Sequence, residues 1–319
     1  VNRVFITDDD KELLPTWLRF VKGVIDSSDL PLNVSREILQ QNRIMAKIKS
    51  NSVKKVLDKI KTISKNKEKY EGFYNEFGRL LKEGVYQEFE HKEALTDLLR
   101  FKTTKEDGYV SLQDYVDRMD SDQKSIYYIT GTNESALRES PLLEMYKDKN
   151  IEVLILDDEI DEIIMPSIPT YKEKDLKSVN RSGAADDLKN DSDKDKEKKV
   201  KPLIKKIKSI LGDKIKDVKA SNRLSNSPSC IVADENDPTA QMQEILKATG
   251  QTGMPEVKPI LEINPDHEII KKLAAMRKSK SFDDGVLLLY EQALLQEGVN
   301  LDNPAGFVKR INKLMEKAL

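Results

Sequence analysis

The sequence has few of the side chains that build disulfide frameworks and metal centres. It contains one cysteine and two histidines among its 319 residues. The single cysteine, Cys230, has no partner for an internal disulfide, so we expect a reducing compartment. It lies in the apolar run "CIVA", which favours a buried strand residue over a reactive thiol. His91 and His267 lie far apart and lack further ligands at metal-binding spacing, so no metal site is expected.

Long apolar runs are also absent. No stretch approaches the roughly 20 residues that a membrane-spanning helix needs, so no membrane partner is expected. The first residues, "VNRVFITDDDKELLP", lack the basic start and apolar stretch of a signal peptide. The chain begins on a strand-like "RVFIT" without an initiator methionine, and we therefore expect a piece cut from a longer protein.

Neither sign of charge is in excess. The 54 basic residues nearly balance the 56 acidic ones, which leaves a formal net charge of -2. A nucleic-acid-binding chain normally carries a basic excess on one face, so nucleic acid is not an expected partner. Aromatic residues make up only 6% of the chain and charged residues 34%. This composition favours a soluble, helix-rich protein over an aromatic-rich β-sandwich.

The N-terminal third is expected to be largely helical. We predict a short strand over 3–7, a helix over 13–24 and a loop at "DSSDLPLN". From residue 35 to about 100, apolar residues recur at three- to five-residue steps. This spacing predicts three helices joined by short loops, which form a coil-like bundle.

The middle of the chain has the pattern of a βαβ unit. "SIYYIT" (125–130) and "IEVLILDD" (151–158) are apolar strand candidates, and a helical segment separates them. A parallel pair with a right-handed crossover is expected. Gly131 after the first strand stands alone, without the glycine spacing of a phosphate loop.

A highly charged segment separates this unit from a second one. Residues 184–199 contain no large apolar residue except Leu188, so we expect a linker or a solvated helix start and the main domain boundary. The pattern beyond it predicts helices and strands in alternation and two closing amphipathic helices at about 282–297 and 303–318. The last helix is expected to start at Asn303-Pro304, a capping residue followed by proline.

Arg36 and Gln40 are the residues that best fit a chemical role. Four residues apart, they leave the same helix face near its N-terminus, where the helix dipole and free N–H groups favour an anion. Arginine can grip a terminal phosphate with two hydrogen bonds, and glutamine can orient a water. The same pair is also common on exposed helices, and its spacing alone leaves both interpretations open.

Several long motifs resemble one protein family. "WLRFVKGVIDSSDLPLNVSREILQQNRIM", "FGRLLKEGVYQEFEHKEALTDLLRF", "SPLLEMYKDKNIEVLILDDEIDE", "SNRLSNSPSCIVAD", "EINPDH" and "LLLYEQALLQEG" closely resemble the 90-kDa heat-shock chaperones. The end, "NKLMEKAL", lacks the acidic tail of the eukaryotic cytosolic members and is similar to the bacterial high-temperature protein G type. Acidic-tail-dependent cochaperones are therefore not expected partners.

The resemblance implies a mixed α/β fold in five parts. Residues 1–34 correspond to the end of a large αβα layer, 35–105 to a helical coil and 106–183 to a small αβα subdomain. Residues 184–200 are the charged linker, and 201–319 form an αβ domain that ends in a helical dimerisation element. The implied location is the bacterial cytoplasm, with an organellar matrix as the alternative.

The resemblance gives the Arg36 segment a role in ATP hydrolysis. "SREILQ" matches the family's catalytic loop, whose arginine reaches the γ-phosphate of ATP. Arg36 and Gln40 are the matching residues, and Asn33 lies in the same loop as a support. ATP and its magnesium are held mainly by an N-terminal domain that has no match here, so this chain alone is expected to be inactive.

The resemblance also implies surfaces for partly folded client proteins and for a second copy of the chain. Met242, Ile245 and Leu246 form an apolar helix face that contacts clients in this family, although such a stripe is usually core. Trp17 is a further client candidate, with core or interface packing as the stronger alternative. The expected homodimer residues are Leu288, Leu289, Leu295, Phe307, Ile311, Leu314 and Met315. The rival hypothesis is a stand-alone αβ scaffold dimer without nucleotide chemistry.

Overall fold

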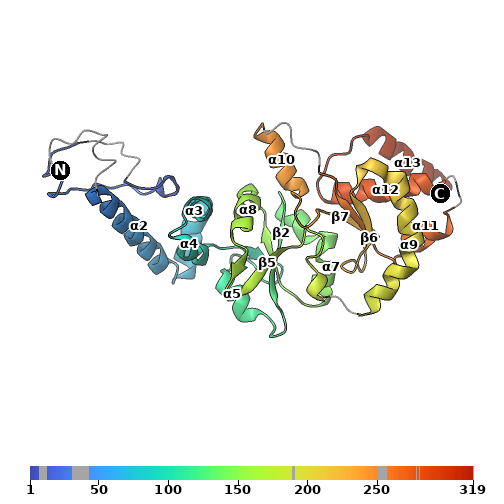
Figure 1. Ribbon diagram of the computed structural model, residues 1–319, viewed down its shortest axis with the longest axis horizontal. Coiled ribbons are helices and arrows are strands. Elements are labelled where there is room, and N and C mark those ends of the chain that lie inside the picture. The colour runs from blue at the N-terminus through green and yellow to red at the C-terminus, as the bar shows by residue number, and fades with distance from the viewer. Residues whose placement is uncertain are drawn as a thin grey trace. The chain divides into compact units, whose positions relative to one another are not determined.

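The computed structural model describes residues 1–6, 13–30, 43–188, 191–250, 257–277, 279 and 281–318. They fall into two compact units. The first comprises Val1–Phe101 and Tyr109–Asp114, and the second comprises Lys102–Gly108 and Tyr115–Leu319. Helices and strands are mixed, as the α/β prediction requires (Figure 1).

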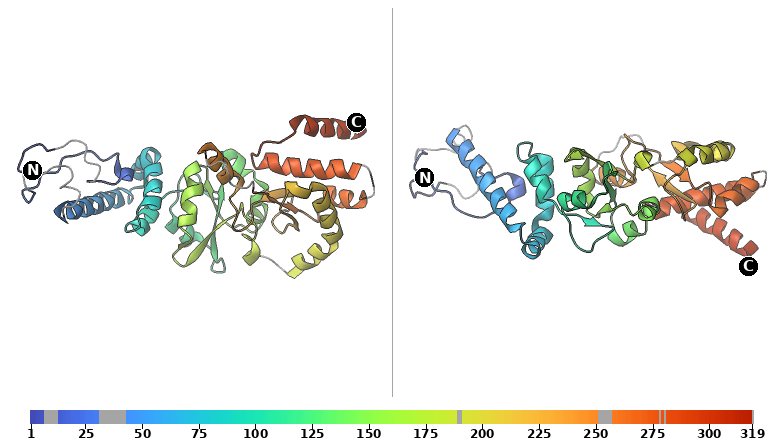
Figure 2. Two further views of the ribbon diagram at one scale, coloured as in Figure 1. Left: turned by 45° about the horizontal axis from the view of Figure 1, so that its top comes forward. Right: turned by 90° about the horizontal axis from the view of Figure 1, so that it is seen from below.

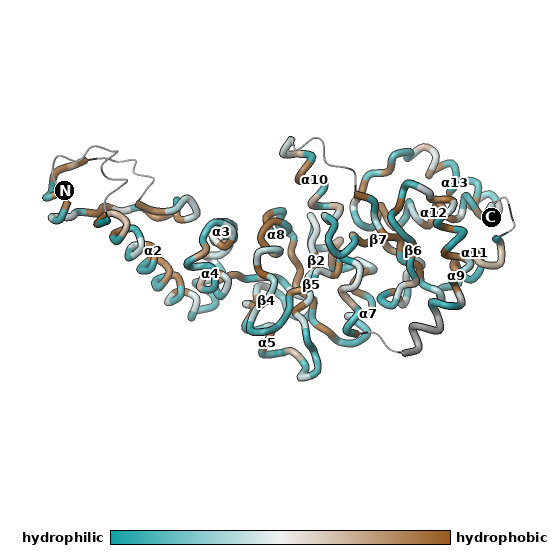
Figure 3. The backbone as a smooth tube through the Cα atoms, in the orientation of Figure 1, coloured by the Kyte–Doolittle hydropathy of each residue, from teal (hydrophilic) through white to brown (hydrophobic). Residues whose placement is uncertain are grey.

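Three helices dominate the first unit, as predicted. They are α2 (Arg43–Ile63), α3 (Lys67–Gln87) and α4 (Lys92–Leu98). The apolar residues of α2 recur as brown patches along a mostly teal helix in Figure 3. Four of them are buried: Met45, Val53, Leu57 and Ile60. The spacing that predicted the helix therefore marks its buried face.

The two elements expected before this bundle are wrong. Residues 1–6 form a turn and unpaired coil, not a strand. The predicted helix over 13–24 is reduced to one 3-10 turn, η1 (Thr16–Leu18). Gly23 and the β-branched residues Val21 and Val24 have low helix propensity, and they follow the turn as irregular chain.

The second unit begins with a five-stranded sheet in the order β1-β3-β2-β5-β4. At its centre, β2 (Ser125–Thr130) pairs in parallel with β3 (Val153–Leu156), which confirms the predicted βαβ pair. It also pairs in parallel with β5 (Lys174–Ser178). The short strands β1 (Lys102–Thr103) and β4 (Thr170–Tyr171) pair antiparallel at the edges.

The connection between β2 and β3 is not the single helix that the sequence suggested. It consists of α6 (Glu134–Arg138), η2 (Pro141–Leu143) and α7 (Glu144–Asp148). Helix α6 ends at Arg138, and Ser140 caps the next turn, where Pro141 cannot continue the earlier helix because it lacks an N–H. Helix α8 (Glu159–Ile164), followed by η3 (Met165–Ser167), also belongs here, whereas α5 (Leu112–Arg118) begins in the first unit and ends in the second.

The charged segment continues into α9 (Asp191–Leu211) after the short turn η4 (Asp186–Leu188). Of the two interpretations of this segment, the helix start is therefore the correct one. The division between the compact units falls near residues 101–115 instead. After η5 (Gly212–Lys214), a second sheet follows in the order β6-β8-β7. Its strands are β6 (Asp217–Ala220), β7 (Ser229–Val232) and β8 (Ile260–Ile263).

Four helices complete the chain: α10 (Ala240–Ala248), α11 (Glu268–Ala275), α12 (Ser281–Gln296) and α13 (Pro304–Ala318). Helix α12 packs on β7, and α13 lies beside α12 (Figure 2). Asn303 caps α13 as predicted, because its side chain accepts a hydrogen bond from Gly306 N at 2.8 Å. No helix in the described part of the chain is long and apolar enough to cross a membrane.

A buried arginine joins the two sheets of the second unit. Arg223 is 1% exposed and forms an ion pair with Glu262 on β8 at 3.0 Å. Its guanidinium also donates to Val179 O at 2.6 Å and to Arg181 O at 3.0 Å, both just beyond β5. Burial disfavours its charge, but the Glu262 carboxylate outweighs burial and raises the pKa of Arg223. This link fixes the walls of the cavity described below.

Candidate functional site

The predicted phosphate-contacting residues Arg36 and Gln40, with Asn33, lie outside the described residues. Their roles stay predictions. The candidate site that the structure does describe is helix α10 with the cavity beside it, both within the second unit.

Helix α10 is held at its N-terminus by a closely bonded loop. The Thr239 side chain caps the helix by accepting from Met242 N at 3.1 Å. In the loop before it, Arg181 donates to Glu235 O at 2.9 Å and to Asp237 O at 2.5 Å. Lys216 pairs with Asp234 at 2.6 Å and with Asp237 at 2.7 Å. The start of α10 is therefore positioned by both sheets.

The predicted client face of α10 is neither core nor fully exposed. Met242, Ile245 and Leu246 are all half-buried, and no residue of α10 is buried. The helix packs against α8 of the first sheet's layer. The three apolar side chains therefore keep part of their surface accessible, unlike ordinary core residues.

Trp17 requires a correction. Its side chain is fully buried, and its indole N–H donates to Glu88 at 3.2 Å. It packs so closely on α3 that a Cβ at Gly84 would lie 2.9 Å from Trp17 Cδ2. Trp17 is thus a core residue of the first unit, as the alternative interpretation expected, and it offers no surface to a client in this structure.

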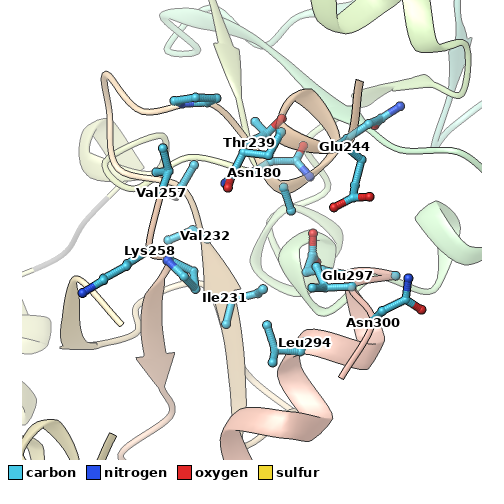
Figure 4. A pocket seen from close by; sticks show the side chains of 18 of the residues that line it. Asn180, Ile231, Val232, Thr239, Glu244, Val257, Lys258, Leu294, Glu297 and Asn300 are labelled. Atoms are coloured by element: carbon cyan, nitrogen blue, oxygen red, sulfur yellow. The ribbon is translucent and has the colours of Figure 1, made fainter. Parts of the chain in front are cut away.

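A cavity of about 450 Å³ lies beside α10 (Figure 4). Its walls come from the end of β2, from β7, from the first turns of α10 and from residues at and beyond the end of α12. One side is apolar and includes Ile231, Val232 and Leu294. The polar lining includes Asn180, Glu244 and Glu297, and the Glu244 and Glu297 carboxyl groups point into the cavity in Figure 4.

The lysines that line the cavity are paired with rim carboxylates. Lys214 pairs with Asp302 at 3.4 Å, Lys247 with Glu244 at 2.9 Å and Lys258 with Asp213 at 3.1 Å. Glu297 forms no ion pair with any described residue. Burial therefore raises the pKa of Glu297 to about 7, although the Asn180 side chain opposes the rise by hydrogen bonding.

Asn180 belongs to a buried polar floor. Its side-chain oxygen accepts from Thr130 N at 2.9 Å, and its amide donates to Thr130 O at 3.2 Å. The Thr130 hydroxyl also donates to Glu162. Gln241 lines the same cavity, and both polar atoms of its side chain are buried without a hydrogen-bond partner. A buried amide without partners is costly, so it is a feature that needs an explanation.

The structure places the predicted dimerisation residues in three environments. Leu288 and Leu289 are buried, and Leu289 packs in the core of the second sheet, so neither lies on an accessible face of this chain. Phe307 and Ile311 are half-buried. Leu295, Leu314 and Met315 are 47%, 50% and 52% exposed.

His267 and Cys230 have structural roles. His267 caps α11 by accepting from Ile269 N at 3.1 Å. Cys230 is buried in β7, as predicted, and burial raises the pKa of its thiol. Among the described residues, no group of three histidine, cysteine or acidic side chains is arranged to hold a metal ion.

Sequence reasoning missed the residues of the cavity. Glu297 precedes Gly298 at the end of an amphipathic helix, a position that normally indicates a solvated last turn. Gln241 and Asn180 are single polar residues without any spacing signal. Only the fold brings these segments together.

Comparisons with known proteins agree over the whole chain. The profile of the family described as "Hsp90 protein" matches residues 1–319. The Chaperone protein HtpG of Treponema denticola is 56% identical over 324 residues, which cover 99% of this chain and 51% of that protein. The proteins of the same name from Treponema pallidum and Wolinella succinogenes are both 49% identical, over 99% and 100% of this chain and 51% and 52% of their own. This chain thus spans about half the length of these relatives.

Proposed function

Because the chain belongs to the Hsp90 family, we propose that it is the middle and C-terminal part of an ATP-dependent molecular chaperone. The observation that carries this proposal is the family match over all 319 residues, together with relatives named as HtpG chaperones. A stand-alone scaffold without nucleotide chemistry is not favoured by that match. We expect the bacterial cytoplasm as the location and heat stress as the setting.

Client binding is assigned to the apolar face of α10. The half-burial of Met242, Ile245 and Leu246 supports this assignment, because a core face would be covered. Methionine is flexible and polarizable, which suits a surface that accepts many partners. The capped and anchored N-terminus of α10 presents this face in a fixed position.

Site-specific crosslinking tests the client surface. A photo-crosslinking side chain at position 242 is expected to capture an unfolded substrate protein. The matched control is position 269 on α11, where Ile269 is an apolar residue, 50% exposed, on another helix. Equal capture at both positions, or none at position 242, would contradict the assignment.

Homodimerisation is assigned to the exposed apolar residues near the C-terminus. Three half-exposed large side chains support this assignment. Leu314 and Met315 are neighbours on α13, and Leu295 is at the end of α12, which contacts α13. Sedimentation of the wild-type chain is expected to show a dimer at micromolar concentration. The double variant Leu314→Glu/Met315→Glu is expected to sediment as a monomer, whereas Ile269→Glu is not. A wild-type monomer at these concentrations would refute the assignment.

The nucleotide role is assigned to Arg36, with Gln40 and Asn33 as helpers. The support is the "SREILQ" motif within a chain of this family. Arg36 is expected to contact the γ-phosphate of an ATP bound mainly, with magnesium, by an N-terminal domain. The chain by itself is then expected to hydrolyse essentially no ATP.

A further inference from the structure

The cavity beside α10 contains a carboxyl group, that of Glu297, which forms no ion pair with any described side chain. The three lysines on its lining are already paired with Asp302, Glu244 and Asp213. The Glu297 carboxyl, by contrast, has the Asn180 amide as its hydrogen-bonding neighbour, and the charge of Arg223, which does not line the cavity, acts on it without forming an ion pair. A cationic group at this position would regain the ion pairing that Glu297 lacks.

The unpartnered amide of Gln241 is the second, independent observation. Gln241 lines the cavity, and the oxygen and the nitrogen of its side chain are buried without a hydrogen-bond partner. One N–H donor and one acceptor from a ligand would satisfy them. Most buried polar groups in proteins are paired, so two such atoms on a residue that lines a cavity favour a polar ligand beside it.

The remaining surface of the cavity suits an alkyl chain. Ile231, Val232 and Leu294 form its apolar part, and Leu294 lies beside Glu297 at the end of α12. A volume of about 450 Å³ is within the range of small-molecule sites and holds a group of the size of an arginine or lysine side chain. Asn180, bonded twice to Thr130, provides a rigid floor.

We propose that this cavity binds an alkylguanidinium or alkylammonium group, with the cation on Glu297, the alkyl stem on Ile231, Val232 and Leu294, and further polar contacts to Gln241. A guanidinium forms two parallel hydrogen bonds with a carboxylate, so it is the preferred head group. The same chemistry is found in free small amines and in the basic side chains of an unfolded segment. The site stands apart from the client hypothesis, since it rests on Glu297 and Gln241 and not on the apolar face of α10.

Calorimetric titration with N-acetyl-arginine methylamide tests the proposal on the whole chain. The wild type is expected to bind this probe and to show at least about tenfold weaker binding of the citrulline counterpart, which has the same shape without the charge. Binding is also expected to weaken about tenfold from pH 8 to pH 6, because Glu297 with a pKa of about 7 becomes mostly protonated over this range.

Two variants and one control complete the test. Glu297→Gln is expected to abolish binding and its pH dependence, and Gln241→Leu is expected to weaken binding severalfold while keeping the pH dependence. Glu268→Gln, which changes an exposed carboxylate paired with Lys271 outside the cavity lining, is expected to leave binding within about twofold. Thermal unfolding of each variant verifies that it is folded. No wild-type binding at about 10 mM probe, equal binding of the citrulline compound, or unchanged binding by folded Glu297→Gln would each overturn the proposal.

A competition experiment identifies the source of the cation. Agmatine carries the guanidinium on an alkyl stem without a peptide backbone. If agmatine binds at least as tightly as the peptide-like probe, the ligand is a free small amine. If only the peptide-like probe binds, and an arginine-containing unfolded peptide displaces it, the ligand is a basic side chain.

Discussion

The buried Arg223–Glu262 pair should contribute strongly to the stability of the second unit. Both side chains are almost wholly buried, at 1% and 6% side-chain exposure. Arg223→Met removes the cation but keeps much of the volume, and it leaves the Glu262 carboxylate buried without its charge partner. Breaking one side of such a pair costs about 3–5 kcal/mol. The carbonyl groups of Val179 and Arg181 lose their donors in addition.

The expected loss of stability in Arg223→Met is large enough to measure directly. For a unit of this size, 1 kcal/mol corresponds to about 2–4 °C, so the midpoint of thermal unfolding should fall by about 6–20 °C. Urea unfolding followed by circular dichroism reports the change. Trp17, the only tryptophan in the chain, lies in the first unit, so its fluorescence is an internal reference that should not shift.

Two further variants separate the buried charge from general packing. Arg223→Met/Glu262→Met removes both charges and is expected to be more stable than Arg223→Met alone, because no carboxylate is then left unpaired. Lys271→Ala breaks the exposed pair with Glu268 and should cause no measurable shift. A loss below about 1 kcal/mol for Arg223→Met, or a double variant less stable than the single one, would refute the reasoning.

Three other predictions concern single residues of the two units. Gly84→Ala should destabilise the first unit by about 1–3 kcal/mol in urea unfolding followed by Trp17 fluorescence, because its Cβ would lie 2.9 Å from Trp17. A Cβ at Gly72 in the same helix would meet only open space, so Gly72→Ala should not destabilise the unit. An equal loss of stability in both variants would contradict the packing argument. Glu144 is partly buried, but bonds from Ser227 and from the N–H groups of 225–227 outweigh burial and lower its pKa. Its contribution should therefore be present at neutral pH and be lost on acidification below about pH 4, so that Glu144→Gln and wild type converge in acid; a constant gap would contradict it. For Glu297 the pH dependence of stability has the opposite sign, because its pKa is raised and folding becomes less favourable as the pH rises from about 4.5 to 7. Glu297→Gln should be more stable than the wild type at pH 8, by up to about 3 kcal/mol, and the gap should close toward pH 5 in thermal unfolding.

Periodic apolar patterns predicted the core elements of the fold well. "SIYYIT" was predicted as a strand over the same residues that form β2. A strand of a parallel sheet that is buried on both faces has a continuous apolar sequence, and such a run can be recognised from the sequence alone. The three helices of the first unit and the start of α13 at Asn303 were also predictable, since helix periodicity and capping are local signals. The antiparallel pair β4 and β5 was not expected, because "TYKEKDLKS" is polar and short.

The candidate site was much less predictable than the fold. Helix α10 and its apolar face followed from spacing and from the family resemblance. The cavity did not, because its polar residues come from positions as distant as Asn180, Gln241 and Glu297 and become neighbours only in the folded unit. The burial of Leu289 and Trp17 was likewise a tertiary outcome, since an apolar residue in an amphipathic pattern can face a core or a partner.

The most direct test of the proposed chaperone function is ATP turnover by a fused protein. The remaining part of the Treponema denticola relative, which this chain does not match, is joined to the chain, and Arg36→Ala is compared with the unsubstituted fusion. Losing a contact to the charge that develops on the phosphate costs about 2–4 kcal/mol, so kcat should fall by about 30- to 1,000-fold. The matched control is Arg43→Ala, which removes an exposed arginine at the start of α2 and should leave turnover unchanged. An active fusion in which Arg36→Ala changes kcat by less than about threefold would contradict the account.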